Sequence, residues 1–149
     1  MVMVEGITSA KEEIMRAIKV FHALPMSGFS DDDITERLAK EDEEIRHLFE
    51  TAGIDVMILH PYMDELTDDE VELKQIRHMN LHYFGLSLAE GIAKCDIIAF
   101  GHNWRVARGC IVEQFISEMY GIKCVELDKE YTPEKLLSIV KHAIVVDDE

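Results

Sequence analysis

Short, mostly apolar runs alternate with amphipathic stretches along this chain. The apolar runs lie at residues 20–24, 54–59, 96–100 and 122–127, and most end close to a proline, glycine or histidine. Runs of this length that alternate little predict strands buried on both faces, as in a parallel sheet. The pattern therefore predicts four buried strands.

Between these runs, apolar residues recur at helical spacing. Ser30 and the three aspartates after it predict a helix N-terminus, and Gly53 predicts the end of that helix. Further helices are predicted at residues 11–19, at residues 74–94, before Gly121 and after Thr132. Strands that alternate with helices in this way favour a parallel sheet covered on both faces.

The predicted fold class is α/β, a single-domain Rossmann- or flavodoxin-like three-layer sandwich with a mostly parallel sheet of four to five strands. A chain of 149 residues is long enough for one hydrophobic core. We expect one domain over residues 1–149, with a lead-in helix at 1–18, a core at 19–127 and a C-terminal helix at 132–149.

The charge of the chain limits its partners. Thirty acidic residues against 15 basic ones give a formal charge of −15, which argues against binding to nucleic acid or to an anionic membrane. The three cysteines form no paired motif, and the N-terminus lacks the basic start and apolar core of a signal peptide. These features favour a cytoplasmic protein with reduced thiols.

Ligands of open parallel sheets bind beyond the carboxyl ends of the strands, at a switch in strand order. Residues 22–30, 60–64 and 101–113 are expected to converge there. The first segment contains Ser27 and Gly28, and the third contains an Arg108-Gly109 pair and Glu113, which we expect in the first turn of a helix. Free N–H groups at a helix start attract small anions.

Three motifs occur in order along the chain: residues 21–28 (Phe-His-Ala-Leu-Pro-Met-Ser-Gly), residues 86–90 leading to Cys95-Asp96, and residues 107–113 (Ala-Arg-Gly-Cys-Ile-Val-Glu) followed by Tyr-Gly-Ile. In these motifs the chain resembles the nucleoside 2-deoxyribosyltransferase-like superfamily, which includes a nucleotide N-glycosidase branch and small phage and bacterial relatives. The resemblance covers residues 19–127.

The resemblance implies cleavage or transfer at the N-glycosidic bond of a nucleoside, a deoxynucleoside or a nucleoside 5′-monophosphate. Glu113 matches the carboxylate that attacks the sugar, and Asp96 matches the residue that handles the proton of the departing base. The implied substrate-binding residues are His22, Pro25, Met26, Ser27, Gly28, Tyr83, Trp104, Arg108, Gly109 and Cys110. The resemblance implies no metal or organic cofactor, and it implies a homo-oligomer.

Two departures from the family pattern keep a second function open. Phe21 stands where the transferases carry a tyrosine, and an arginine-containing loop stands where they often carry an aspartate. Both features suit a non-catalytic protein that binds a nucleotide or an ADP-ribose-like ligand in the same crevice. Glu113 itself could also serve only to complement the helix dipole.

Two polar groups of residues have simpler interpretations. His78 and His82 are four residues apart, as metal ligands can be, and His60 and Asp64 could join them, but solvated histidines are the favoured interpretation. The acidic run at residues 41–44 is interpreted as the solvated face of a helix.

Overall fold

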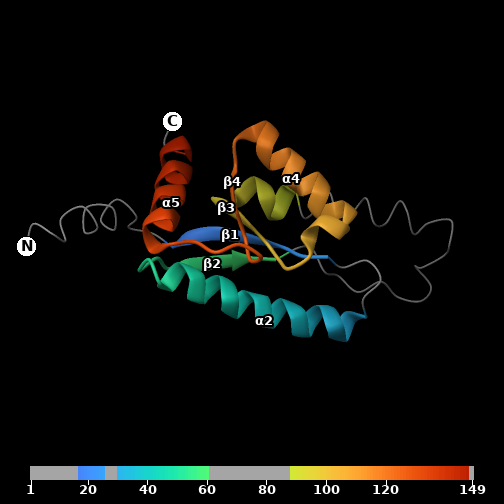
Figure 1. Cartoon of the computed structure of the whole chain (residues 1–149). Helices are drawn as coiled ribbons and strands as arrows, with labels where there is room; N and C mark the ends of the chain where they lie inside the picture. Colours follow the sequence, from blue (N-terminus) through green and yellow to red (C-terminus); the bar gives the residue numbers. More distant parts are fainter. Residues whose placement is uncertain (1–16, 26–29, 61–87, 148–149) are drawn as a thin grey trace, which may run out of the picture.

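The computed structural model describes residues 17–25, 30–60 and 88–147. Strands and helices alternate along these residues (Figure 1), as the sequence predicts. The elements are β1 (Ile18–Ala23), α2 (Asp31–Glu50), β2 (Val56–Leu59), the 3₁₀ turn η1 (Ile92–Lys94), β3 (Ile97–Phe100), the 3₁₀ turn η2 (Trp104–Val106), α4 (Arg108–Tyr120), β4 (Lys123–Glu126) and α5 (Pro133–Asp147).

The four described strands form one parallel sheet in the order β2-β1-β3-β4. The chain runs outward from β1 to β2 and then crosses to β3 on the other side of β1. This order places a switch point between β1 and β3, as in flavodoxin-like sheets. The predicted fold class, an α/β sandwich around a parallel sheet, is confirmed.

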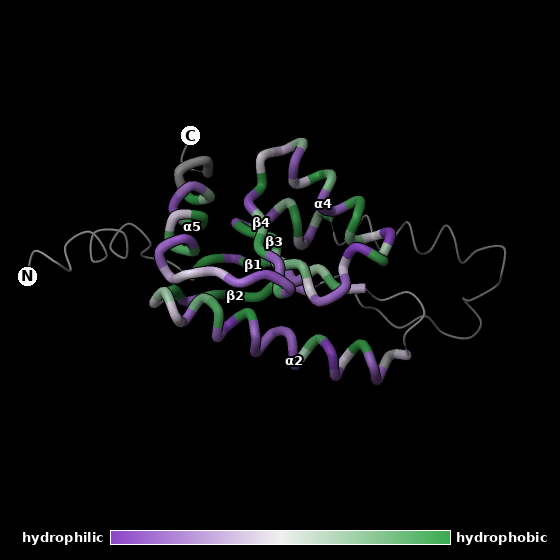
Figure 2. The backbone as a smooth tube through the Cα atoms, viewed as in Figure 1, coloured by the Kyte–Doolittle hydropathy of each residue, from purple (hydrophilic) through white to green (hydrophobic). Residues whose placement is uncertain are grey.

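Helices cover both faces of the sheet (Figure 1). On one face, Ile45 and Phe49 of α2 pack with Leu136 and Val140 of α5 against alternate residues of the strands. On the other face, Cys110 lies on the buried side of α4 and packs with residues of η1, η2 and the remaining strand positions. Figure 2 shows hydrophobic and hydrophilic segments following each other along α2, as expected for a helix with one buried side.

The helix ends follow the local signals in the sequence. Ser30 caps α2 by accepting a hydrogen bond from the backbone N–H of Asp33. Gly53 and Gly121 have φ angles of 70° and 71°, a left-handed conformation that glycine adopts without a Cβ clash. Gly121 ends α4, as predicted.

Three predictions about elements are corrected. Ile18 and Lys19, which we expected to close a helix at 11–19, belong to β1, where the first side chain is buried and the second exposed; residues 11–16 lie outside the described residues. The helix predicted at 74–94 does not continue to residue 94, because a turn at Gly91 separates helical residues 88–90 from η1. Residues 74–87 lie outside the described residues.

The third correction concerns Glu113. Because α4 begins at Arg108, Glu113 lies in its second turn, and the first turn contains no acidic residue. A helix dipole acts mainly within the first turn. Complementing the dipole therefore does not explain why a carboxylate stands at this position.

Among the described residues, every helix is too short or too polar to span a lipid bilayer.

Candidate functional site

The carboxyl ends of the four strands meet at one edge of the sheet, and histidines and acids gather there. His22 is the fifth residue of β1, His60 directly follows β2, and His102 lies two residues after β3. The alternation along β1 places His22 on the same face as Val20, toward α2. A cluster of titratable side chains thus lies beside the switch point.

His22 is fully buried and lies between two carboxylates of α2. Its Nδ1 atom is 2.8 Å from Oδ1 of Asp42, and its Nε2 atom is 2.7 Å from Oε1 of Glu41. Burial lowers the pKa of His22, but the two hydrogen bonds outweigh burial and raise that pKa above its ordinary value. Burial raises the pKa of the two acids, but hydrogen bonds outweigh it and lower the pKa of both. These bonds come from His22 to each acid, from Arg37 and the backbone of His102 to Glu41, and from His60 to Asp42.

Glu41 is held on its second oxygen as well. Nε of Arg37 donates to Oε2 at 3.0 Å, and the backbone N–H of His102 donates to the same oxygen at 3.1 Å. Arg37 also donates to the carbonyl oxygen of His102. Gly101 makes this approach possible, since a Cβ at Gly101 would lie 2.1 Å from Oε1 of Glu41.

The interpretation of residues 41–44 as a solvated helix face is wrong for its first two members. Glu41 is 2% exposed and Asp42 is 7% exposed, whereas Glu43 faces solvent and Glu44 is half-buried. Composition alone favours solvation of an acidic run, because burial of unpaired carboxylates is costly. His22 and Arg37 supply the partners that make burial tolerable here.

His60 extends the cluster toward solvent. Its Nε2 atom lies 2.7 Å from Oδ2 of Asp42, and its side chain is 39% exposed. Asp42 therefore contacts a buried histidine with one oxygen and a partly exposed histidine with the other.

A second group of polar side chains forms around His102. Its Nδ1 atom lies 2.6 Å from Oδ1 of Asp128, and its Nε2 atom lies 3.1 Å from Oε1 of Glu44. These hydrogen bonds raise the pKa of His102, that with Asp128 most. Asn103, which follows, has a φ of 60° and donates its backbone N–H to Asp128. The loop after β3 is thereby tied to the loop after β4.

Glu113 lies on the buried side of α4 and is only 6% exposed. In the part of the chain that the structure describes, no hydrogen bond or ion pair to its carboxyl group is found. Burial raises its pKa to about 8. Burial thus favours the protonated form of this carboxyl group near neutral pH.

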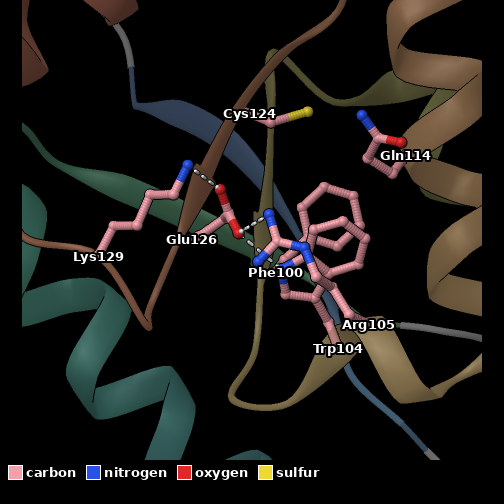
Figure 3. A pocket seen from close by; sticks show the side chains of 7 residues that line it. All are labelled: Phe100, Trp104, Arg105, Gln114, Cys124, Glu126 and Lys129. Carbon is pink, nitrogen blue, oxygen red and sulfur yellow. Dashed lines mark hydrogen bonds and ion pairs between the residues drawn. The ribbon is translucent and has the colours of Figure 1, made fainter.

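An open hollow of about 300 Å³ lies between α4 and the end of β4 (Figure 3). It is lined by Phe100, Trp104, Arg105, Gln114, Cys124, Glu126 and Lys129. Gln114, the neighbour of Glu113, lines this hollow, and Glu113 does not.

The polar groups of the hollow bind one another. Glu126 accepts a hydrogen bond of 2.8 Å from the indole N–H of Trp104 and forms ion pairs with Arg105 and Lys129 at 3.2 and 2.7 Å. The Arg105 guanidinium lies 4.7 Å from the centre of the Trp104 ring. Stacking of a base on Trp104, as the resemblance implies, would require Arg105 to move from that face.

Asp96 lies at the opposite, amino edge of the sheet. It precedes β3, its Oδ2 accepts a hydrogen bond of 2.8 Å from the backbone N–H of Lys19, and its own N–H donates to the carbonyl of Lys19 at 2.7 Å. These contacts tie the start of β3 to the start of β1. The structure therefore does not bring Asp96 to the carboxyl edge, where we expected it to handle a proton.

The other predicted site residues are only partly brought together. Pro25 is buried just after β1, Arg108 is exposed at the first residue of α4, and Gly109 is half-buried behind it. Cys110 is buried, and burial raises the pKa of its thiol to about 12. The predicted positions Met26, Ser27, Gly28 and Tyr83, together with Asp64, His78 and His82, lie outside the described residues.

Sequence reasoning missed Glu41, Asp42 and His102 as members of a site. One signal was available: Arg37 and Glu41 have the i, i+4 spacing of a helical ion pair, which the structure confirms. Comparisons with protein-family models, with curated proteins and with solved structures find no match. The function is therefore argued from the site itself.

Proposed function

We propose that this protein cleaves or transfers the N-glycosidic bond of a nucleoside, a deoxynucleoside or a nucleoside 5′-monophosphate, with Glu113 as the nucleophile. The observation that carries the proposal is the burial of the Glu113 carboxyl group, which is only 6% exposed. Burial of an ionisable group is costly, and ionisable groups in such environments concentrate at functional sites.

The chemistry would proceed in two displacements. A carboxylate oxygen of Glu113 forms a bond to C1′ of the sugar as the C1′–N bond breaks, and the bonding electrons leave with the base, which takes up a proton. Water or a second base then attacks C1′ and releases Glu113. The low exposure of Glu113 favours this role, because a carboxylate in a dry site stabilises the positive charge that develops on the sugar more strongly than it would in water.

A second candidate function is binding of a nucleotide or an ADP-ribose-like ligand without cleavage. The observation that favours it is the pKa of Glu113, raised by burial to about 8. A carboxyl group that is protonated at neutral pH is a hydrogen-bond donor and a poor nucleophile. Recovery of an unchanged ligand after long incubation would support this function.

The first test is incubation with a panel of nucleosides and nucleotides, followed by chromatography for free base. Glu113→Gln is expected to lower the rate of base release at least about 1,000-fold, as loss of a nucleophile does. Glu118→Gln, on the exposed side of the same helix, is the matched control and should retain the wild-type rate. Equal rates in Glu113→Gln and wild type would exclude Glu113 as the nucleophile.

The pH dependence of the same reaction separates two roles for Glu113. A nucleophile must be deprotonated, so with a pKa of about 8 the rate should rise with pH up to about 8 and then level off. The rise should be about tenfold per pH unit below that point. If the rate instead falls as pH passes 8, Glu113 donates a proton and another group attacks the sugar.

A further inference from the structure

We propose that His22, Asp42 and His60 form a binding site for a divalent transition-metal ion of the zinc type. Each of the three side chains offers one donor atom, and these atoms all lie within 4.8 Å of one another. Two imidazoles and one carboxylate are a common set of protein ligands for zinc. The three residues come from the end of β1, from α2 and from the residue after β2, so the fold itself assembles the set.

The donor atoms are already so close together that an ion could bind between them with little rearrangement of the side chains. Nδ1 of His22 and Nε2 of His60 lie 2.8 and 2.7 Å from the two oxygens of Asp42. Zinc binds nitrogen and oxygen ligands at about 2.0–2.2 Å, so the ion would replace these two hydrogen bonds with coordination bonds. Small rotations of His60, which is partly exposed, can adjust the third ligand.

The surroundings of His22 match those of a histidine that binds a metal. Such a histidine usually gives its other ring N–H to a carboxylate, which fixes the orientation of the ring. Nε2 of His22 lies 2.7 Å from Glu41, and Glu41 is held in turn by Arg37 and by the backbone N–H of His102. Glu41 thus orients a ligand without contacting the ion.

The charge of the cluster also favours a cation. Glu41 and Asp42 carry two negative charges, and Arg37 carries one positive charge, so the set has an excess of one negative charge when both histidines are neutral. The cluster adjoins the hydrophobic core at Val20 and Ile45, where that excess needs a counter-charge. A divalent cation bound at the cluster would supply that counter-charge.

The donor set also indicates which ions would bind. Magnesium and calcium prefer oxygen ligands, whereas imidazole favours zinc and its first-row neighbours. Three protein ligands leave at least one coordination position for water or for an anionic ligand. The site lies on the α2 face of the sheet, whereas Glu113 lies on α4 on the other face, so this inference does not depend on the proposed glycosidic chemistry.

The test is isothermal titration calorimetry on the full-length chain. The protein is first stripped of metal by a chelator and is then titrated with Zn²⁺ in the presence of excess Mg²⁺. We expect one high-affinity ion per chain. His60→Gln removes a partly exposed ligand and is expected to weaken zinc binding at least about 100-fold. This loss is larger than that expected when a group that only hydrogen-bonds to a ligand is removed. Glu41→Gln alters the group that orients the His22 ring without contacting the ion, and it is expected to weaken binding about 10- to 100-fold.

The control comes from the same helix as Asp42. His47→Gln changes an exposed histidine of α2 outside the proposed ligand set, and it should retain one ion per chain at wild-type affinity. Absence of a stoichiometric ion in the wild type would overturn the proposal. So would equal affinities in His60→Gln and wild type, or an equal loss in His47→Gln, which would indicate diffuse attraction to the acidic surface.

Discussion

Glu113→Gln is expected to stabilise the protein at alkaline pH. The folded state holds the pKa of Glu113 at about 8, above the ordinary value of 4.5 for this side chain. Between these two values the folded state binds more protons than the unfolded state, so the free energy of unfolding falls as pH rises, by about 1.4 kcal/mol per pH unit. Glutamine stays neutral and avoids that loss.

The gain from Glu113→Gln should therefore grow from pH 5 to pH 8 and then level off, to a total of roughly 3 to 5 kcal/mol at pH 9 relative to pH 5. Urea unfolding of wild type and variant at pH 5, 7 and 9 measures it. Glu118→Gln reports any general effect of removing one negative charge from the same helix. A variant that is less stable than wild type by the same amount at every pH would contradict the expectation.

This prediction bears on function as well as stability. If Glu113→Gln is more stable and also inactive in base release, the chain retains a charge-bearing group at a cost to its own stability, which is typical of active sites. If the variant is more stable and retains activity, Glu113 takes no part in the reaction and its burial is only structural. The two measurements together thus separate a functional carboxyl group from a merely buried one.

Gly101→Ala is expected to lower the free energy of unfolding by roughly 2 to 4 kcal/mol, the combined size of overpacking and of disturbed hydrogen bonds to a charged group. A Cβ at this position would lie 2.1 Å from Oε1 of Glu41. The Glu41 carboxylate cannot simply swing away, because it is buried and is held by His22, Arg37 and the backbone N–H of His102.

Gly121→Ala is the matched control for this substitution. Nothing lies within 4 Å of a Cβ there, and the φ of 71° alone accounts for an expected cost of about 1 kcal/mol. In a Glu41→Ala background, where the clash is absent, Gly101→Ala should cost much less than in wild type. Urea unfolding of the two single variants and the double variant measures this coupling, and strict additivity would show that Glu41 is not the cause.

The sequence by itself determined the elements whose signals are local. Ser30 predicts the start of α2 because its side chain can accept from an N–H three residues away, and the structure confirms that bond. Gly121 predicts the end of α4 because the left-handed conformation needed there favours glycine. Apolar runs predicted the four strands that the structure describes. The expected burial on both faces holds for β3 and most of β1, whereas the edge strands β2 and β4 are partly exposed.

Local patterns gave wrong results where two elements meet. Ile18 and Lys19 fit a helical stripe by spacing, but pairing with β2 draws them into β1. The position of Glu113 within its helix depends on where α4 begins, and a boundary is the least certain part of any prediction from periodicity. Asp96 is a strand-end residue in the sequence, and only the pairing of β3 with β1 shows that it binds the backbone at the amino edge.

Only the tertiary structure decided the cluster at the carboxyl edge. His22 lies 19 and 20 residues from the acids that flank it, and His60 lies 18 residues from Asp42. No spacing rule connects these positions, because their separation is set by the lengths of α2 and of the loops around it. The parallel sheet brings the carboxyl ends of β1, β2 and β3 to one edge, and α2 packs so that Glu41 and Asp42 contact the histidines there. Two acids of a run that composition assigns to solvent, Glu41 and Asp42, thereby become the buried partners of two histidines.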